Sequence, residues 1–302
     1  MKVVVTTATG QIGGALTNLL LDAGAEAILP VRHPEKVARF AARGARIMQG
    51  SQDDAGFVTE ALRGAHALFW LTPPDYLAQD FRAHQNHYGQ VAAAAVRANR
   101  GVRVVNLSSV GAHVGEGVGQ VSGAGDVEKI LNQAAADVTH LRPAYFMENF
   151  LWQLEAIAAK GGIFMPMKPS TRIPMIATRD IARAAADRLL DASWSGQSAL
   201  ELLGPGDLSF AEAAANISAG LGRPISYIQI PEDAVRQMMI GSGRAGTSFV
   251  ELLMQMYRAL DSGLMCPSQP RTAANSTPTT MLAFAREVMA PMLAAKRESA
   301  GT

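Results

Sequence analysis

The chain has 302 residues, of which 48% are hydrophobic and 18% are charged, so it can bury one large core or two modest ones. A formal net charge of +1 gives no general reason to expect a nucleic acid or an anionic membrane as a partner. Cys266 is the single cysteine, which excludes an internal disulfide and fits a reducing compartment. The sequence shows no signal peptide and no apolar run near ~20 residues, so we expect a soluble cytoplasmic protein.

The first predicted elements are a strand, a tight turn and a helix. Residues 3–5 are valines, the turn passes through Thr7 and Gly10, and apolar residues at helical spacing follow. Such a turn aims the N–H groups and the positive dipole end of the helix at the space above the strand, where a phosphate binds well. Gly10 lets a pyrophosphate approach the backbone, and Gly13 lets the helix pack tightly on the strand. A plain turn without a ligand is the structural alternative.

The second predicted strand, residues 27–31, ends at Arg32, with Lys36 one helical turn further on. In dinucleotide folds, an acidic residue at this place binds the ribose 2′-hydroxyl, whereas an arginine accommodates a 2′-phosphate. A guanidinium can grip a phosphate through two hydrogen bonds, and the ammonium adds a second charge. The alternative is a solvated basic start of a helix, which the helix dipole would oppose. We therefore predict NADP(H) in preference to NAD(H).

Strands and helices continue to alternate along the chain. This rhythm predicts an α/β fold of the Rossmann type, with a doubly wound parallel sheet that is covered by helices on both faces. The further predicted strands are residues 45–49, 67–71, 102–107, 138–142 and 199–203, and the predicted helices are residues 57–63, 79–100 and 179–190.

The chain after residue 204 differs, since predicted helices there are joined by loops rich in Gly, Ser and Pro. Its methionines, such as Met256 and Met265, could cover a substrate or fill the helix core, and residues 241–246 could form a lid hinge. We assign residues 1–155 to a dinucleotide-binding domain to which residues 176–203 return, and residues 156–175 and 204–302 to a smaller, mainly helical lobe. The predicted helices are residues 210–220, 231–240, 249–261 and 281–294.

His84 and His87 lie three residues apart on the long predicted helix, a spacing that could hold a metal. No cysteine or glutamate joins them in a recognisable pattern, so we interpret them as a solvated or interface pair and expect no metal site. The same helix, residues 79–100, could pack against a second subunit in a homodimer.

Several motifs in this order and spacing resemble one known family. They are TTATGQIGG, VRHPEK, LTPP, LSSVGA and LRPAYFMEN, followed late in the chain by TPTTMLAFARE. This combination is similar to the NmrA-like family of atypical short-chain dehydrogenase/reductases, and within it to NADPH-dependent quinone and triphenylmethane-dye reductases. The resemblance implies a Rossmann domain, a smaller C-terminal lobe and an active site in the cleft between them.

The resemblance also implies roles for individual residues. Arg32 and Lys36 would hold the 2′-phosphate, and Ser108 would lie near the nicotinamide. The segment that cradles the pyrophosphate would include Thr7 and would consist mainly of Thr9, Gly10, Gln11, Ile12 and Gly13. The adenine and ribose side would be lined by Leu71, Thr72 and Pro73, and the nicotinamide ring and substrate pocket would be bordered by Pro143, Ala144 and Tyr145.

The chain also departs from the family pattern. Thr7 replaces the usual first glycine, and Ser51 stands where an aspartate commonly ends the third strand. Many short-chain dehydrogenases use a Tyr-x-x-x-Lys pair that delivers a proton as the hydride arrives. Counting back from Glu128, which fits the glutamate four residues after that lysine, places Ala124 at the lysine and Gln120 at the tyrosine. Neither side chain transfers a proton, so ordinary ketone chemistry by this pair is not expected.

Two functions remain open. The first is a reductase that passes hydride to a quinone or another conjugated electrophile, an apolar or aromatic small molecule that needs no strong acid from the protein. Candidates for the wall of its substrate pocket are Tyr145, Met147, Asn149 and Trp152, with Tyr145 as a possible hydrogen-bond donor, although Met147 and Trp152 would serve equally well as structural residues. The second is a non-catalytic NADP(H)-binding redox sensor that changes its contacts with another protein.

Overall fold

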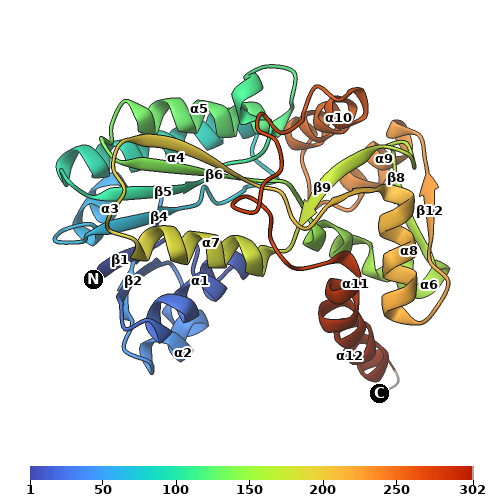
Figure 1. Ribbon diagram of the computed structural model, residues 1–302, viewed down its shortest axis with the longest axis horizontal. Helices are drawn as coiled ribbons and strands as arrows, with labels where there is room; N and C mark the ends of the chain where they lie inside the picture. The colour runs from blue at the N-terminus through green and yellow to red at the C-terminus, as the bar shows by residue number, and fades with distance from the viewer. Residues whose placement is uncertain (301–302) are drawn as a thin grey trace.

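A computed structural model describes residues 1–300 of the chain. Its centre is a seven-stranded parallel sheet in the order β10-β6-β5-β4-β1-β2-β3 (Figure 1). The strand order reverses between β1 and β4, and such a switch point is where open α/β sheets bind their ligands. The predicted Rossmann-type fold is therefore confirmed. The strands are β1 (Lys2–Val5), β2 (Glu26–Val31), β3 (Arg46–Gln49), β4 (Ala67–Trp70), β5 (Arg103–Leu107), β6 (Val138–Pro143) and β10 (Gln197–Leu202).

Helices cover both faces of this sheet, so the strands have apolar side chains on both sides. On β1, Val3 and Val5 pack in a core with α1 and α7, while Val4 faces the opposite core with α3 and α4. Figure 1 shows α1 and α7 below the sheet and α4 and α5 above it. The helices of the sheet domain are α1 (Gln11–Asp22), α2 (Ala38–Ala41), α3 (Ala55–Ala61), α4 (Phe81–Ala98), α5 (Gln120–Asn132) and α7 (Thr178–Leu190).

Helix α5 was absent from the sequence-based prediction because it contains two glycines, which lower helix propensity. Both glycines allow close packing. A Cβ on Gly123 would lie 2.1 Å from Gln85 Oε1, and a Cβ on Gly125 would lie 2.5 Å from the Ala112 carbonyl oxygen. The packing of α5 against α4 and the sheet therefore outweighs its weak local preference.

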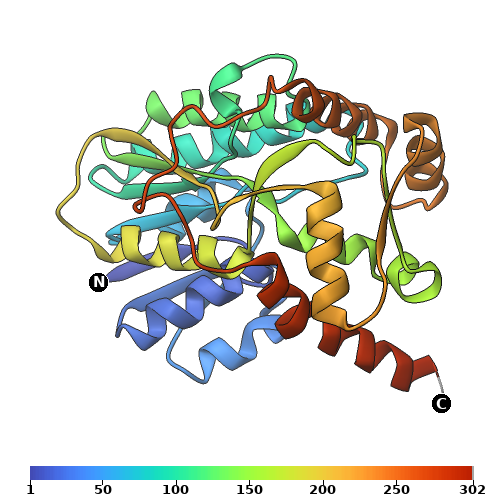
Figure 2. The same ribbon diagram turned by 45° about the vertical axis from the view of Figure 1, so that its right-hand side comes forward.

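A second hydrophobic core forms the smaller lobe, which includes two small sheets in addition to its helices. These strands were not predicted, because each has five residues or fewer and pairs with a distant segment. Figure 2 shows α8 beside α11 in this lobe. The strands are β7 (Tyr145–Phe146), β8 (Gly162–Met165), β9 (Arg172–Ile176), β11 (Asp207–Ser209) and β12 (Ser226–Gln229), and the helices are α6 (Leu154–Lys160), α8 (Phe210–Leu221), α9 (Glu232–Gly241), α10 (Thr247–Ser262), α11 (Met281–Phe284) and α12 (Ala290–Ala300).

The last predicted helix, residues 281–294, is interrupted. A π-helical turn at Ala285–Met289 separates α11 from α12, where the chain packs against α8. A Cβ on Gly220 of α8 would lie 2.5 Å from Ala285 Cβ, so the two helices approach closely at this turn. Within residues 1–300, none of the helices has the length and apolar character that a membrane span requires.

Candidate functional site

The turn between β1 and α1 has the geometry of an anion site. Gly10 precedes α1 in an extended conformation, and no described side chain caps the helix or places a negative charge in its first turn. A Cβ on Gly13 would lie only 2.4 Å from the Thr7 carbonyl oxygen, so the helix packs directly against the turn. The N–H groups at the start of α1 and the helix dipole are thus available to an anion.

Thr7 has a backbone conformation that favours glycine. Its φ is +55°, the left-handed region that β-branched residues rarely adopt. Its carbonyl accepts a hydrogen bond from Gly10 N at 2.9 Å, and its buried hydroxyl has no partner within the described chain. The turn therefore keeps a glycine-type shape, but at the expense of local strain.

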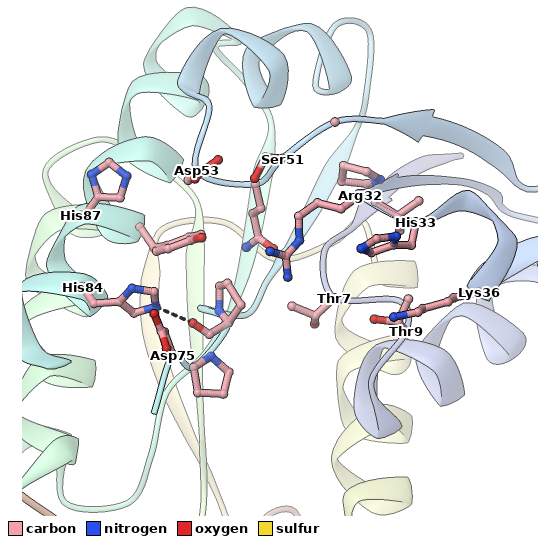
Figure 3. A pocket seen from close by; sticks show the side chains of 17 residues that line it. Thr7, Thr9, Arg32, His33, Lys36, Ser51, Asp53, Asp75, His84 and His87 are labelled. Carbon is pink, nitrogen blue, oxygen red and sulfur yellow. Dashed lines mark hydrogen bonds between the residues drawn. The ribbon is translucent and has the colours of Figure 1, made fainter. Parts of the chain in front are cut away.

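A cavity of about 650 Å³ lies at the carboxyl ends of β1, β2 and β3. Figure 3 shows Arg32 pointing into it, with His33 and Lys36 on the same side and Asp75 and His84 opposite. Neither Arg32 nor Lys36 forms an ion pair with any residue of the described chain, whereas His33 Nδ1 lies 3.3 Å from Glu35. The cavity is lined by Thr7, Thr9, Pro30, Val31, Arg32, His33, Lys36, Gly50, Ser51, Gln52, Asp53, Pro73, Pro74, Asp75, His84, His87 and Tyr88.

Sequence reasoning found one side of this cavity and missed the other. The missed residues follow β3 or lie on α4, and Gln52 donates a hydrogen bond to the Leu71 carbonyl at 2.9 Å. His84 Nε2 lies 2.8 Å from the Pro73 carbonyl oxygen, which ties α4 to the loop after β4. Residues 50–53 could have been predicted to line the cavity, because they follow the strand next to β2 and the carboxyl ends of parallel strands lie at one edge of the sheet.

A second cavity of about 300 Å³ lies between the carboxyl ends of β4, β5 and β6 and the lobe helix α10. Pro74 lines both cavities, so they lie side by side along the sheet edge. The walls of this cavity are mainly apolar and aromatic. They are formed by Leu71, Thr72, Pro74, Tyr76, Phe81, Gln85, Leu107, Ser108, Ser109, Gln120, Val121, Ala124, Val127, Ala144, Tyr145, Phe146, Asn149, Met256 and Met265.

Two of the predicted pocket residues do not line this cavity. Met147 is completely buried in the lobe core, as expected if its role is structural. Trp152 is 68% exposed and meets the ring of Tyr76 edge-on, with the ring centroids 5.9 Å apart. The side chains of Met147 and Trp152 therefore point away from the space they were expected to border.

The structure places three other residues that were predicted to bind the cofactor at the start of α1 and in β6. Ile12 is buried in the sheet-domain core, so only its main chain faces the β1–α1 turn. Pro143 is buried within β6, and its carbonyl accepts a hydrogen bond from Val110 N at 3.0 Å. Gln11 begins α1, where its side-chain oxygen lies 3.5 Å from Thr178 Oγ1.

Tyr145 lies in the wall of the second cavity, in T-shaped contact with the rings of Phe150 and Phe210 at centroid distances of 6.0 and 5.7 Å. Burial holds the pKa of Tyr145 well above its ordinary value of 10.0. Among the described residues, its hydroxyl makes a long contact of 4.0 Å to Met165 Sδ, and Asn149 acts weakly to lower its pKa. The phenol is therefore neutral, and it can donate a hydrogen bond into the cavity.

Behind the same cavity lies a buried charged pair. Arg142 donates two hydrogen bonds to Glu128, at 2.9 and 2.6 Å, and Ser108 Oγ donates a third at 2.5 Å. Desolvation by burial acts to raise the pKa of Glu128, but the hydrogen bonds and charges of its neighbours, chiefly Arg142, prevail and lower it. Glu128 is therefore a carboxylate.

The two positions that correspond to the tyrosine and the lysine of a Tyr-x-x-x-Lys pair both face the second cavity. Gln120 and Ala124 line it from α5, and Gln120 Nε2 lies 3.4 Å from Met256 Sδ. Gln85 Oε1 is buried without a hydrogen-bond partner among the described residues. The polar groups of this wall are thus carboxamides and hydroxyls.

Comparison with known proteins gives consistent matches. The model of the NmrA-like family matches residues 1–267. An NAD(P)H azoreductase from Xenophilus azovorans is 29% identical over 260 residues, which cover 84% of this chain and 86% of the relative. Quinone oxidoreductase 2 from Escherichia coli strain K12 is 25% identical over 232 residues, or 76% of this chain and 78% of the relative.

Solved structures share the architecture. The triphenylmethane reductase of Citrobacter sp., complexed with NADP(H), is similar with a TM-score of 0.79 at 20% identity, over 95% of this chain and 99% of that one. This likeness shows the fold, and the family match covers both the sheet domain and most of the lobe. The chain belongs to the NmrA-like family.

Proposed function

We propose that the protein is an NADP(H)-dependent reductase that transfers hydride to a quinone-like or other conjugated electrophilic small molecule. The observation that carries this proposal is the pair of adjoining cavities at the switch point, one with unpaired cations and one with apolar, aromatic walls. The first suits the phosphorylated end of NADP(H), and the second suits a planar acceptor beside the nicotinamide.

The residues present fit the cofactor. The N–H groups at the start of α1 would bind the pyrophosphate, while Arg32 and Lys36 would bind the 2′-phosphate. Ser108, Ala144 and the backbone at Pro143 would border the nicotinamide. When bound, NADPH supplies the hydride, and the protein holds the acceptor against it in a cavity with mainly apolar and aromatic walls.

The second cavity supports an acceptor that needs no strong acid. Its phenols are those of Tyr76 and Tyr145, and burial raises the pKa of both, so each is a hydrogen-bond donor and a poor proton source. No tyrosine of the sequence is followed by a lysine four residues later. Quinones, azo compounds and cationic dyes accept hydride under these conditions, and the names of the azoreductase, the quinone oxidoreductase and the triphenylmethane reductase agree with such acceptors.

Steady-state oxidation of NADPH with a panel of quinones, azo compounds and triphenylmethane dyes tests the proposal. We expect turnover with at least one class and a strong reduction by Ala124→Leu, which fills the second cavity. Ala94→Leu, on the exposed face of α4, is the matched control and should leave turnover unchanged. Tight NADPH binding without turnover on any acceptor would instead support the redox-sensor alternative.

A further inference from the structure

The hydroxyl proton of Ser108 already forms a hydrogen bond inside the protein. Ser108 Oγ donates it to Glu128 Oε1 at 2.5 Å, and the hydroxyl makes no other hydrogen bond within residues 1–300. Ser108 nevertheless lines the second cavity. A serine hydroxyl has one proton and two lone pairs, so only lone pairs remain for a ligand.

Glu128 can hold that proton in place because it is itself immobilised as an acceptor. Its side chain is 7% exposed and receives two hydrogen bonds from Arg142, whose side chain is also largely buried. An ionised carboxylate has no proton to give back, so the direction of the Ser108 bond is determined. The lowered pKa of Glu128 agrees with this assignment.

We propose that Glu128 is a positioning residue that makes Ser108 a hydrogen-bond acceptor in the second cavity, so that the site selects a ligand group carrying an O–H or N–H at this point. This inference rests on the proposed function of the cavity. Tyr145, from the lobe side of the same cavity, offers the opposite polarity, since its hydroxyl can donate. The cavity thus combines an acceptor on the sheet side with a donor on the lobe side, which orients an asymmetric planar ligand.

A pair of planar probes tests the polarity of Ser108. We would measure the affinities of 2-naphthol and 2-methoxynaphthalene by calorimetry on the full chain saturated with NADP⁺. In the second probe a methyl group replaces the hydroxyl proton, so only the naphthol can donate a hydrogen bond. Wild type should bind the naphthol about fivefold more tightly, the equivalent of one neutral hydrogen bond. Ser108→Ala should bring this ratio to near one, while the affinity for the ether stays the same.

A double substitution tests the role of Glu128. Glu128→Met with Arg142→Met removes the carboxylate and the cation together, and apolar replacement of a buried ion pair is often tolerated. The Ser108 proton is then free to turn into the cavity, so the preference for the naphthol should disappear or reverse. Arg63→Met with Glu60→Met removes an ion pair at the surface and should keep the wild-type ratio.

The inference would be overturned if wild type bound both probes equally or bound neither of them. It would also be overturned by a naphthol preference that persists in Ser108→Ala. Should the double variant not fold, the Ser108→Ala ratio decides alone. NADPH turnover, measured on the same preparations, separates this test from the proposed function. Turnover with equal probe binding refutes only the inference, whereas a Ser108-dependent preference without turnover on any acceptor refutes only the reductase.

Discussion

At the scale of single residues, Arg32 should decide between the two nicotinamide cofactors. Its guanidinium points into the first cavity without a counter-ion in the described chain (Figure 3). Charge-assisted hydrogen bonds to a phosphate contribute about 1.5–3 kcal/mol. Arg32→Ala should therefore weaken NADPH binding by roughly 10- to 100-fold and leave NADH binding nearly unchanged.

Calorimetric titration with each cofactor measures this difference. Arg46→Ala, which removes an exposed arginine at the start of β3, is the control and should change neither affinity. If Arg32→Ala kept the full preference for NADPH, the 2′-phosphate would bind elsewhere.

Thr7 is the residue at which strain is most evident. Replacing it by glycine relieves a left-handed conformation that costs a β-branched residue about 1–2 kcal/mol, and it removes a buried hydroxyl without a partner. Part of this gain is lost because glycine is freer in the unfolded chain. Thr7→Gly should raise the free energy of unfolding by about 0.5–1 kcal/mol.

Thermal denaturation of the variant tests this expectation. Thr9→Gly is a suitable comparison, because Thr9 lies in the same turn with an ordinary negative φ, and its replacement should destabilise the fold. A lower melting temperature for Thr7→Gly would show that the threonine side chain stabilises the turn in another way.

At the scale of elements, the contact between α1 and the turn depends on one of two neighbouring glycines. A Cβ at position 13 would approach the Thr7 carbonyl oxygen to 2.4 Å, whereas a Cβ at Gly14 would meet nothing closer than 3.3 Å. Gly13→Ala should cost about 1–3 kcal/mol and reduce NADPH affinity at least tenfold, since the turn must move away from the helix. Gly14→Ala should change neither the free energy of unfolding nor the NADPH affinity by much. Chemical denaturation and cofactor titration compare the two variants.

The Glu128–Arg142 pair joins α5 to β6, and it has a predictable pH dependence. Arg142→Met leaves a buried carboxylate without its cation and should lower the free energy of unfolding by about 3–5 kcal/mol at pH 7. In wild type the pKa of Glu128 is lowered, so the pair stabilises above the ordinary value of about 4.5 and loses this contribution as the pH falls below it. In the variant, burial alone raises that pKa, so protonation relieves the penalty on acidification.

The difference in the free energy of unfolding between wild type and Arg142→Met should therefore be smaller at pH 4 than at pH 7. Urea denaturation at both values measures it. Arg63→Met, at an exposed pair with Glu60, should cost less than about 1 kcal/mol at either pH. A difference that stays constant with pH would show that Glu128 is not the group responsible.

How far the sequence predicted these elements depends on where their partners lie. Strands β1, β2 and β4 were predictable because each one is an apolar run that is buried on both faces, whereas the edge strands β3 and β10 are more exposed. Strands such as β8 and β12 are more than 60 residues apart in the sequence, and no local sequence pattern predicts that they pair. Arg32 and Lys36 were predictable from the rule on strand ends. Met256 and Met265 were among the methionines that could cover a substrate or fill the helix core, but no local pattern indicated which cavity they line.

At the scale of the whole molecule, several contacts hold the lobe to the sheet domain. Phe81 N donates to Ser248 Oγ at 3.0 Å, and Gly246 N donates to the Tyr76 carbonyl at 2.7 Å. On the other side, Asp180 accepts two hydrogen bonds from Thr279, at 3.0 and 2.8 Å. The second cavity lies between the two parts, so a bound cofactor and acceptor would contact both.

Cofactor binding should accordingly stabilise both parts together. A ligand that binds only the folded state, present at about 100 times its Kd, adds about 2.7 kcal/mol to the free energy of unfolding. We expect NADPH to shift a single unfolding transition upward by this amount, as followed by both calorimetry and tryptophan fluorescence. Trp70 and Trp194 lie in the cores of the sheet domain and Trp152 on the lobe. Trp152→Phe therefore leaves the sheet-domain fluorescence, and Trp70→Phe with Trp194→Phe leaves the lobe fluorescence. If NADPH moved the sheet-domain signal and left that of Trp152 in place, the two parts would unfold independently, and the lobe would make no energetic contribution to cofactor binding.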